Sequence, residues 1–140
     1  MKFWDASAVL PLLLQEAETA VVQSLYEQDP GIAVWCLTDI EIASALARRA
    51  REGFETDALA RARAELGRLT QHWVEMSSIQ TARSRALRLL NTHPLRAADA
   101  LQLAAALVAS EERPESLSFV CLDDRLREAA RKEGFPVLPS

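Results

Sequence analysis

The feature that most constrains this chain is the alternation of short apolar runs with longer segments of helical periodicity. The clearest runs span residues 2–4, 32–37 and 117–122, and shorter extended segments are expected at 73–76 and 136–138. These runs are apolar throughout, as in strands that are buried on both faces. Strands that alternate with helices predict a parallel sheet. We therefore expect an α/β fold with a short parallel sheet between two helical layers, formed by residues 1–140 as a single domain.

The segments between the runs predict seven helices, several of which have recognisable end signals. Ser7 can cap a helix through Leu14, and Thr38 and Glu41 have the spacing of a capping box. Gly53 and Gly134 are expected to end two later helices. The helix that starts at Thr38 is predicted to run to residue 52, and the one that starts at Asp123 to residue 133. The remaining helices are predicted at residues 16–28, 56–69 and 95–110, and from Ser77 or Ser78 to Leu90.

Two observations argue against a membrane or secreted protein. The most apolar stretch, residues 97–109, contains Asp99 and Gln102 and is too short to span a bilayer. The first residues reach an acid at Asp5, where a signal peptide would need its apolar run. We therefore expect a cytoplasmic protein.

The cysteines and histidines give no sign of a zinc site or of nucleophilic catalysis. Cys36 and Cys121 are far apart and lack ligand spacing, so we expect both to be reduced and buried. His93 precedes Pro94 in a helix break, where we expect it to be exposed. His72 lies near the end of a predicted helix, and neither histidine has a suitable Ser or Cys beside it.

The net charge of −4 argues against a protein that holds nucleic acid through its overall field. The basic residues are nonetheless unusual, because all of them except Lys2 and Lys132 are arginine. Arginine suits phosphate recognition. It also suits solvated helix faces, and the sequence alone leaves both interpretations open.

Four acids are predicted at the carboxyl ends of the strands, where parallel α/β sheets bind their ligands. Asp5 directly follows the first run, and Asp123 directly follows the third. Glu41 lies in the first turn of the helix after the second run. Asp99 lies on a helix that is apolar nearly all round, so its burial without a partner would be costly.

Each acid also has a structural explanation that the sequence does not exclude. Asp5 could cap the first helix, and Glu41 could return to the Thr38 backbone N–H in a capping box. Arg96, three residues before Asp99, could pair with it.

For the last acid, either of two adjacent residues could cap the following helix. We assign Asp123 to the site and Asp124 to solvent. Gln102 lies three residues after Asp99 on the same helix face, so we expect its side chain to orient that carboxylate.

A cluster of four carboxylates requires compensation. Two unit charges about 6 Å apart repel by about 3 kcal/mol at an effective dielectric of about 20, so all the pairs together approach about 17 kcal/mol. A typical domain has a total stability of only about 5–15 kcal/mol. Bound cations or protons must offset this repulsion, and oxygen ligands without His or Cys suit Mg²⁺ or Mn²⁺. Such ions can activate water for hydrolysis of a phosphodiester.

The segments around these acids resemble the motifs of the PIN-domain family, most of all the VapC-type toxins of bacterial toxin–antitoxin pairs. The matching segments are residues 3–8, 39–46, 95–104 and 119–126. In order and spacing they cover essentially the whole chain. Each segment alone is a weak signal, whereas the four in sequence are fairly specific.

The resemblance implies a Rossmann-like α/β/α sandwich with Mg²⁺- or Mn²⁺-dependent endoribonuclease activity. It also implies an RNA substrate, a homodimer, and a cognate antitoxin whose extended segment fills the acidic groove. Ser7 would support the first acid, whereas Cys121 stands where the family usually has a threonine next to the last acid. The catalytic, metal-binding acids would be Asp5, Glu41, Asp99 and Asp123.

Other functions that use aspartate at strand ends fit less well. Phosphotransfer of the haloacid dehalogenase type needs a second Asp two residues after Asp5, where Ser7 stands. A receiver domain needs two adjacent acids early in the chain and a late lysine. Two alternatives stay open: a non-catalytic RNA- or partner-binding module of the same fold, and a housekeeping RNA-processing nuclease without an antitoxin.

Overall fold

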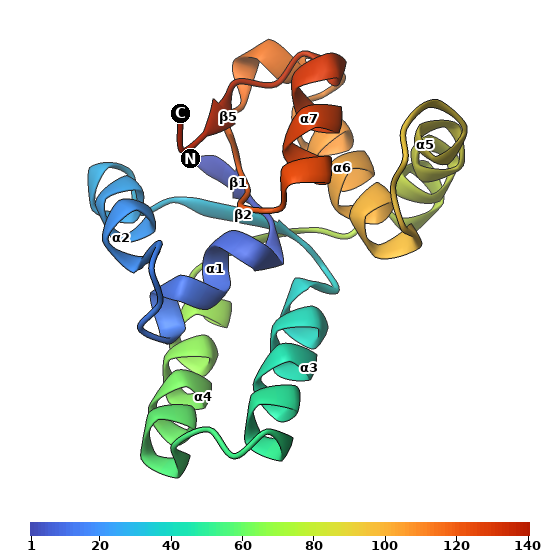
Figure 1. The fold of residues 1–140 in the computed structure, drawn as a ribbon. Helices are drawn as coiled ribbons and strands as arrows, with labels where there is room; N and C mark the ends of the chain where they lie inside the picture. The colour runs from blue at the N-terminus through green and yellow to red at the C-terminus, as the bar shows by residue number, and fades with distance from the viewer.

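The computed structural model describes residues 1–140 as one central sheet with helices on both sides (Figure 1). Its strands are β1 (Lys2–Trp4), β2 (Ile32–Trp35), β3 (Val74–Met76), β4 (Phe119–Val120) and β5 (Val137–Leu138). Its helices are α1 (Ala6–Leu13), α2 (Thr19–Gln28), α3 (Thr38–Arg51), α4 (Thr56–Thr70), α5 (Ile79–Thr92), α6 (Ala97–Ala109) and α7 (Asp124–Glu133). A 3₁₀ turn, Pro114–Ser116, precedes β4.

The sheet is entirely parallel, with the strand order β3-β2-β1-β4-β5. Phe3 of β1 pairs with Ala33 of β2 on one side and with Phe119 of β4 on the other. Strands β2 and β3 are therefore added in turn on one side of β1, and β4 and β5 are then added on its other side. In such sheets the ligand crevice opens at the carboxyl ends of the strands where the order reverses. Here that point lies between β1 and β4.

The strands read as continuous apolar runs because both faces of the sheet are buried. Phe3 and Phe119 point to the face that α5, α6 and α7 cover, whereas Trp4 and Val120 point to the face that α1 to α4 cover. All four side chains are fully buried. The predicted α/β/α arrangement with a short parallel sheet is thereby confirmed.

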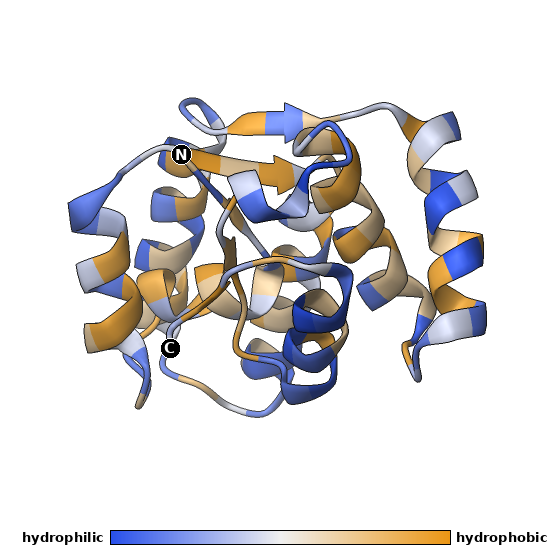
Figure 2. Cartoon of the chain, turned by 90° about the horizontal axis from the view of Figure 1, so that it is seen from above, coloured by the Kyte–Doolittle hydropathy of each residue, from blue (hydrophilic) through white to orange (hydrophobic).

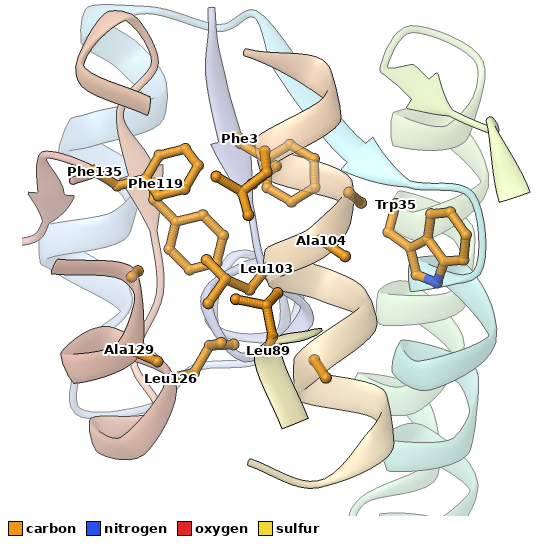
Figure 3. Close-up of a cluster of buried hydrophobic side chains, with 14 of the residues drawn as sticks. Phe3, Trp35, Leu89, Leu103, Ala104, Phe119, Leu126, Ala129 and Phe135 are labelled. Atoms are coloured by element: carbon orange, nitrogen blue, oxygen red, sulfur yellow. The ribbon is translucent and has the colours of Figure 1, made fainter. Parts of the chain in front are cut away.

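The packing of α6 against the sheet fixes the start of that helix. Leu103 and Ala104 have no exposed surface and lie among the aromatic rings of the strands (Figure 3). The rings of Phe3 and Phe119 stack there with centroids 5.7 Å apart. Small residues let α6 approach the sheet closely, and removal of a buried leucine side chain costs about 2–5 kcal/mol. The first turn of α6, which contains Asp99, is therefore held in place by the core.

Polar residues lie mainly on the outer surfaces of the helices. Figure 2 shows largely orange strands between helices that carry blue, hydrophilic segments. In α7 the buried residues are Leu126, Ala129 and Ala130. No helix combines the length and the apolar character that crossing a bilayer requires.

Several predicted ends of helices and strands differ from those observed, each for a local reason. The helix predicted from residue 16 begins at Thr19, whose Oγ1 accepts a hydrogen bond from the Glu16 N–H at 2.8 Å and so holds a preceding turn. The run at 117–122 forms a strand only at Phe119–Val120, where it pairs with β1 and β5. Gly53 and Gly134 follow α3 and α7 with φ of 86° and 103°, as helix-ending glycines do.

The expectation that His93 is exposed was wrong. The residue is buried, and its Nε2 lies 2.7 Å from Oε2 of Glu133, while Nη2 of Arg88 donates to Oε1 at 2.9 Å. Burial raises the pKa of Glu133, but the hydrogen bonds from Arg88 and His93 outweigh it and lower that pKa overall. We call these three residues the Glu133 cluster. It joins the end of α5 to the end of α7.

Candidate functional site

The four predicted acids lie at the carboxyl-end side of the sheet, near the point where the strand order reverses. Asp5 follows β1 and Asp123 precedes α7, while Glu41 and Asp99 lie in the first turns of α3 and α6. Their charges act on one another: Asp5 and Asp99 both raise the pKa of Glu41, and Asp123 and Asp5 raise that of Asp99. We call these four residues the acid cluster.

Asp5 is the most deeply placed acid of the cluster, with 4% of its surface exposed. Its Oδ2 accepts hydrogen bonds from the Ser7 backbone N–H at 3.1 Å and from the Ser7 hydroxyl. Burial raises the pKa of Asp5, although the hydrogen bonds from Ser7 oppose that rise. Asp5 is thus the N-cap of α1, the structural role that the sequence left open for it, whereas Ser7, the other suggested cap, lies within the helix and supports Asp5.

Ser7 and Cys121 hold Asp5 from two segments of the chain. The Ser7 Oγ donates to Asp5 and accepts from the Leu122 N–H at 3.0 Å, which ties the end of β1 to the end of β4. The Cys121 Sγ donates to Oδ2 of Asp5 at 3.6 Å. Burial and then the charge of Asp5 raise the pKa of the Cys121 thiol, so it stays protonated as a donor. This side chain therefore supports the first acid rather than the carboxylate of Asp123.

Glu41 does not form the capping box that its spacing suggested. Leu37 is the N-cap of α3, Thr38 is already helical and buried, and Oε1 of Glu41 accepts from Nε2 of Gln102 at 2.9 Å. The pKa of Glu41 is raised to about 7, first by burial and then by the charges of Asp5 and Asp99, against the hydrogen bond from Gln102.

Gln102 has a different role from the one predicted. It was expected to orient Asp99, but its Nε2 donates to Glu41 and, at 3.1 Å, to the Thr38 hydroxyl. The side chain is fully buried, and its Oε1 has no hydrogen-bond partner. Such an orphaned acceptor costs free energy. The Gln102 amide thus holds Oε1 of Glu41 in place, although burial of its own unpaired Oε1 destabilises the fold.

Asp99 is half-buried and forms no ion pair. The suggested partner, Arg96, lies at the start of the helix but is not among the residues that form salt bridges. Burial, followed by the charges of Asp123 and Asp5, raises the pKa of Asp99 to about 6, while Arg96 and Arg125 act in the opposite direction. The structural explanation of Asp99 as half of an ion pair with Arg96 was therefore wrong.

Asp123 combines the two roles that the sequence left open. Its Oδ1 accepts a hydrogen bond from the Leu126 N–H at 2.9 Å, which makes Asp123 the N-cap of α7. Its charge also contributes to the raised pKa of Asp99. Asp124 was assigned to solvent; it is exposed, yet it lines the same cavity as Asp123.

That cavity has a volume of about 420 Å³, and every residue in its wall except one proline is charged. From the sequence, Arg96 was considered only as a structural partner of Asp99, and Arg125 was not singled out. Their positions in the chain contained the signal, because Arg96 directly precedes the helix that bears Asp99 and Arg125 follows Asp123 and Asp124 in the first turn of α7. The wall is formed by Pro94, Arg96, Asp99, Asp123, Asp124 and Arg125.

A third arginine, Arg127, forms hydrogen bonds to two segments of backbone beside the site. Nη1 of Arg127 donates to the Cys121 carbonyl at 2.7 Å, and its Nη2 donates to the Pro139 carbonyl at 2.6 Å. One guanidinium thus connects the residues that follow β4 with those that follow β5.

The four acids offer only oxygen donors, the kind that a hard divalent cation prefers. No three His, Cys, Asp or Glu side chains are gathered closely enough to hold one ion between them. Mg²⁺, however, is commonly bound through one or two carboxylates, with water and substrate phosphates as its other ligands. Carboxyl groups with raised pKa values, such as Glu41 and Asp99, gain most from a nearby cation.

No family model and no curated protein matches the sequence.

Proposed function

We propose that this chain is a divalent-metal-dependent endoribonuclease that acts as the toxin of a toxin–antitoxin pair. The observation that carries the proposal is the uncompensated acid cluster at the reversal point of the sheet. Its members Glu41 and Asp99 have pKa values raised to about 7 and about 6, and neither forms an ion pair. Uncompensated carboxylates in a crevice are typical of a site that a cation completes.

The residues of the site divide into those that would hold the metal and those that position them. Bound Mg²⁺ or Mn²⁺ would lower the pKa of a water molecule and stabilise the charge on the leaving oxygen of a phosphodiester. Ser7 and Cys121 hold Oδ2 of Asp5, and Gln102 holds Oε1 of Glu41. The metal would be held by Asp5, Glu41, Asp99 and Asp123.

In the metal-free protein, Glu41 gains and loses a proton near neutral pH, because its pKa is raised to about 7. A bound cation favours the ionised carboxylate, so metal binding should release this proton. The hydrogen bond from Gln102 goes to Oε1.

The direct test is cleavage of a labelled single-stranded RNA by the purified protein. We expect hydrolysis in Mg²⁺ or Mn²⁺, and complete loss of hydrolysis when EDTA removes the metal. Cleavage that continues undiminished in EDTA would contradict the metal-dependent mechanism.

The toxin role predicts a partner with a cationic segment. An Arg or Lys side chain in the acid cluster would relieve its repulsion, so an antitoxin should insert one there. Co-expression with the small neighbouring gene product should yield a complex that does not cut RNA. A complex that cuts as fast as the free protein would contradict the toxin role and leave a housekeeping nuclease.

One observation favours a second candidate, a non-catalytic RNA- or partner-binding module of the same fold. The ligating side chains are not gathered tightly enough for three of them to share one ion. The same assay separates the candidates, because the module would bind the oligonucleotide in Mn²⁺ and leave it intact at any protein concentration.

A further inference from the structure

We infer that Arg96 and Arg125 form a phosphate clamp that binds the backbone of the substrate RNA beside the acid cluster. This inference rests on the proposed ribonuclease function and deepens it. It assigns residues to the binding of the substrate, for which the acid cluster alone offers only negative charge.

The first observation is that both guanidinium groups are free although carboxylates surround them. They share one cavity with Asp99, Asp123 and Asp124, yet neither forms a side-chain hydrogen bond or a salt bridge. Other arginines that lie close to acids do pair with them: Arg49 contacts Glu16, Arg68 contacts Glu65 and Arg85 contacts Glu112, each within hydrogen-bond distance.

The second observation is where the elements place the two groups. Arg96 is the N-cap residue of α6, and Arg125 lies in the first turn of α7, so they stand at the starts of two helices that border the same cavity. The first turn of α6 has no side-chain cap, so its N–H groups add further donors at this end. Phosphate oxygens are acceptors that both guanidinium forks and helix starts bind well.

The third observation is the arrangement of charge. The cavity wall contains three aspartates and two arginines, so cationic and anionic side chains line the same space. A metal ion bound by the acids would leave the arginines available to the phosphates on either side of the bond to be cut. Positive groups on the rim also offset the repulsion between the acid cluster and a polyanionic substrate.

The test measures binding without cleavage. All variants carry Asp99→Asn, so that the probe survives, and the probe is a fluorescein-labelled ten-nucleotide single-stranded RNA in Mg²⁺. We expect Arg96→Ala and Arg125→Ala each to weaken binding about tenfold and to reduce the slope of log K against log salt by about 0.7. Lysine at either position should keep the slope and restore only part of the affinity. The matched control is Arg63→Ala, an exposed arginine on α4 without a partner, which should change neither quantity.

Unchanged affinity and slope in both alanine variants would overturn the clamp, as would an equal loss in the Arg63 control. DNA of the same sequence should lose affinity equally, because the phosphates are shared; a loss confined to RNA would overturn the assignment to phosphate. The slope is read only on variants that melt at the temperature of the Asp99→Asn protein, so misfolding does not imitate the effect. The nuclease proposal is tested separately, by RNA cleavage with the wild-type chain. If Arg96 and Arg125 are needed for RNA binding but the wild-type chain does not cleave RNA, the clamp is supported and the nuclease proposal fails.

Discussion

The acid cluster and the Glu133 cluster both contain partly buried carboxylates, but the surroundings of these carboxylates shift their pKa values in opposite directions. Glu133 accepts hydrogen bonds from Arg88 and contacts His93, and its pKa is lowered. Glu41 and Asp99 face other acids instead, and their pKa values are raised. One cluster is compensated within the fold, whereas the other is left for a ligand to compensate.

Under the proposed function, this difference should separate structural from functional acids. A compensated carboxylate stabilises the folded chain, so its removal should damage stability and spare activity. An uncompensated carboxylate destabilises the folded chain, so its removal should spare stability and damage activity. Four changes test the comparison.

The largest effect is expected for Asp99→Asn. The substitution keeps the shape of the side chain and removes the charge of a proposed metal ligand, so under the proposed function RNA cleavage should fall to below about 1% of wild type. The metal-free variant should melt at the same temperature as wild type or higher, because repulsion and desolvation are both reduced. Mn²⁺ in hundredfold excess over Kd stabilises a one-site protein by about 2.7 kcal/mol, and the variant should lose most of that gain. A strongly destabilised variant with an unchanged response to Mn²⁺ would place Asp99 with the structural acids.

The next effect concerns the buried amide that positions Glu41. Gln102→Met keeps the volume of the side chain, removes the donor to Oε1 and also removes the orphaned acceptor. We expect Mn²⁺ affinity and cleavage to fall about 10–100-fold, as when a group that orients a metal ligand is lost. The melting temperature without metal should stay close to that of wild type. Calorimetric titration with Mn²⁺ measures the first effect, and unaltered affinity would show that Glu41 needs no such support.

The matching change in the compensated cluster is Glu133→Gln. It leaves Arg88 and the buried His93 without their anionic partner, which should cost about 1–3 kcal/mol of unfolding free energy. Cleavage per folded molecule should equal that of wild type. Urea unfolding measures the loss of stability, and an RNA cleavage assay on the same preparation measures activity. A loss of activity with full stability would reverse the roles assigned to the two clusters.

The smallest effects are expected in the pH dependence, and they should have opposite signs. Glu41 has a folded pKa of about 7 against an ordinary 4.5, so the unfolded chain ionises first and metal-free stability falls as pH rises between these values. Glu41→Gln should remove that fall. The pKa of Glu133 is lowered, so its contribution is complete above 4.5 and is lost as pH drops further. Melting curves from pH 3.5 to 8 should therefore show Glu41→Gln gaining stability relative to wild type as pH rises from 4.5 to about 7. The deficit of Glu133→Gln should grow as pH rises to 4.5 and stay constant above it.

The sequence was a good guide to everything that depends on neighbouring residues. Continuous apolar runs predicted strands buried on both faces, and Asp5 and Asp123 were placed correctly because each directly follows such a run. Gly53 and Gly134 marked helix ends because a left-handed residue at such a position favours glycine.

The sequence was a poor guide to side-chain partners that are distant in the chain. Gln102 bonds Glu41 across 61 positions, so its spacing from Asp99 was misleading. His93 finds Glu133 across 40 positions, and nothing near His93 indicates that it is buried. The capping box was not formed for a related reason: the buried Thr38 hydroxyl accepts a hydrogen bond from Gln102 instead of capping the start of the helix. Local patterns identify which residues reach the site, whereas tertiary packing decides which of them hold one another.

The two bonds of Arg127 have a consequence for how the edge of the molecule opens. Strands β4 and β5 contain two residues each, so few backbone hydrogen bonds hold them. Because Arg127 donates to both the Cys121 and the Pro139 carbonyls, the end of the chain and the approach to Asp123 should behave as one cooperative unit. In hydrogen exchange, the amides of residues 121–123 should then become labelled together with those of β5 and earlier than those of β1. Fraying of the last few residues would thereby reach the acid that begins α7.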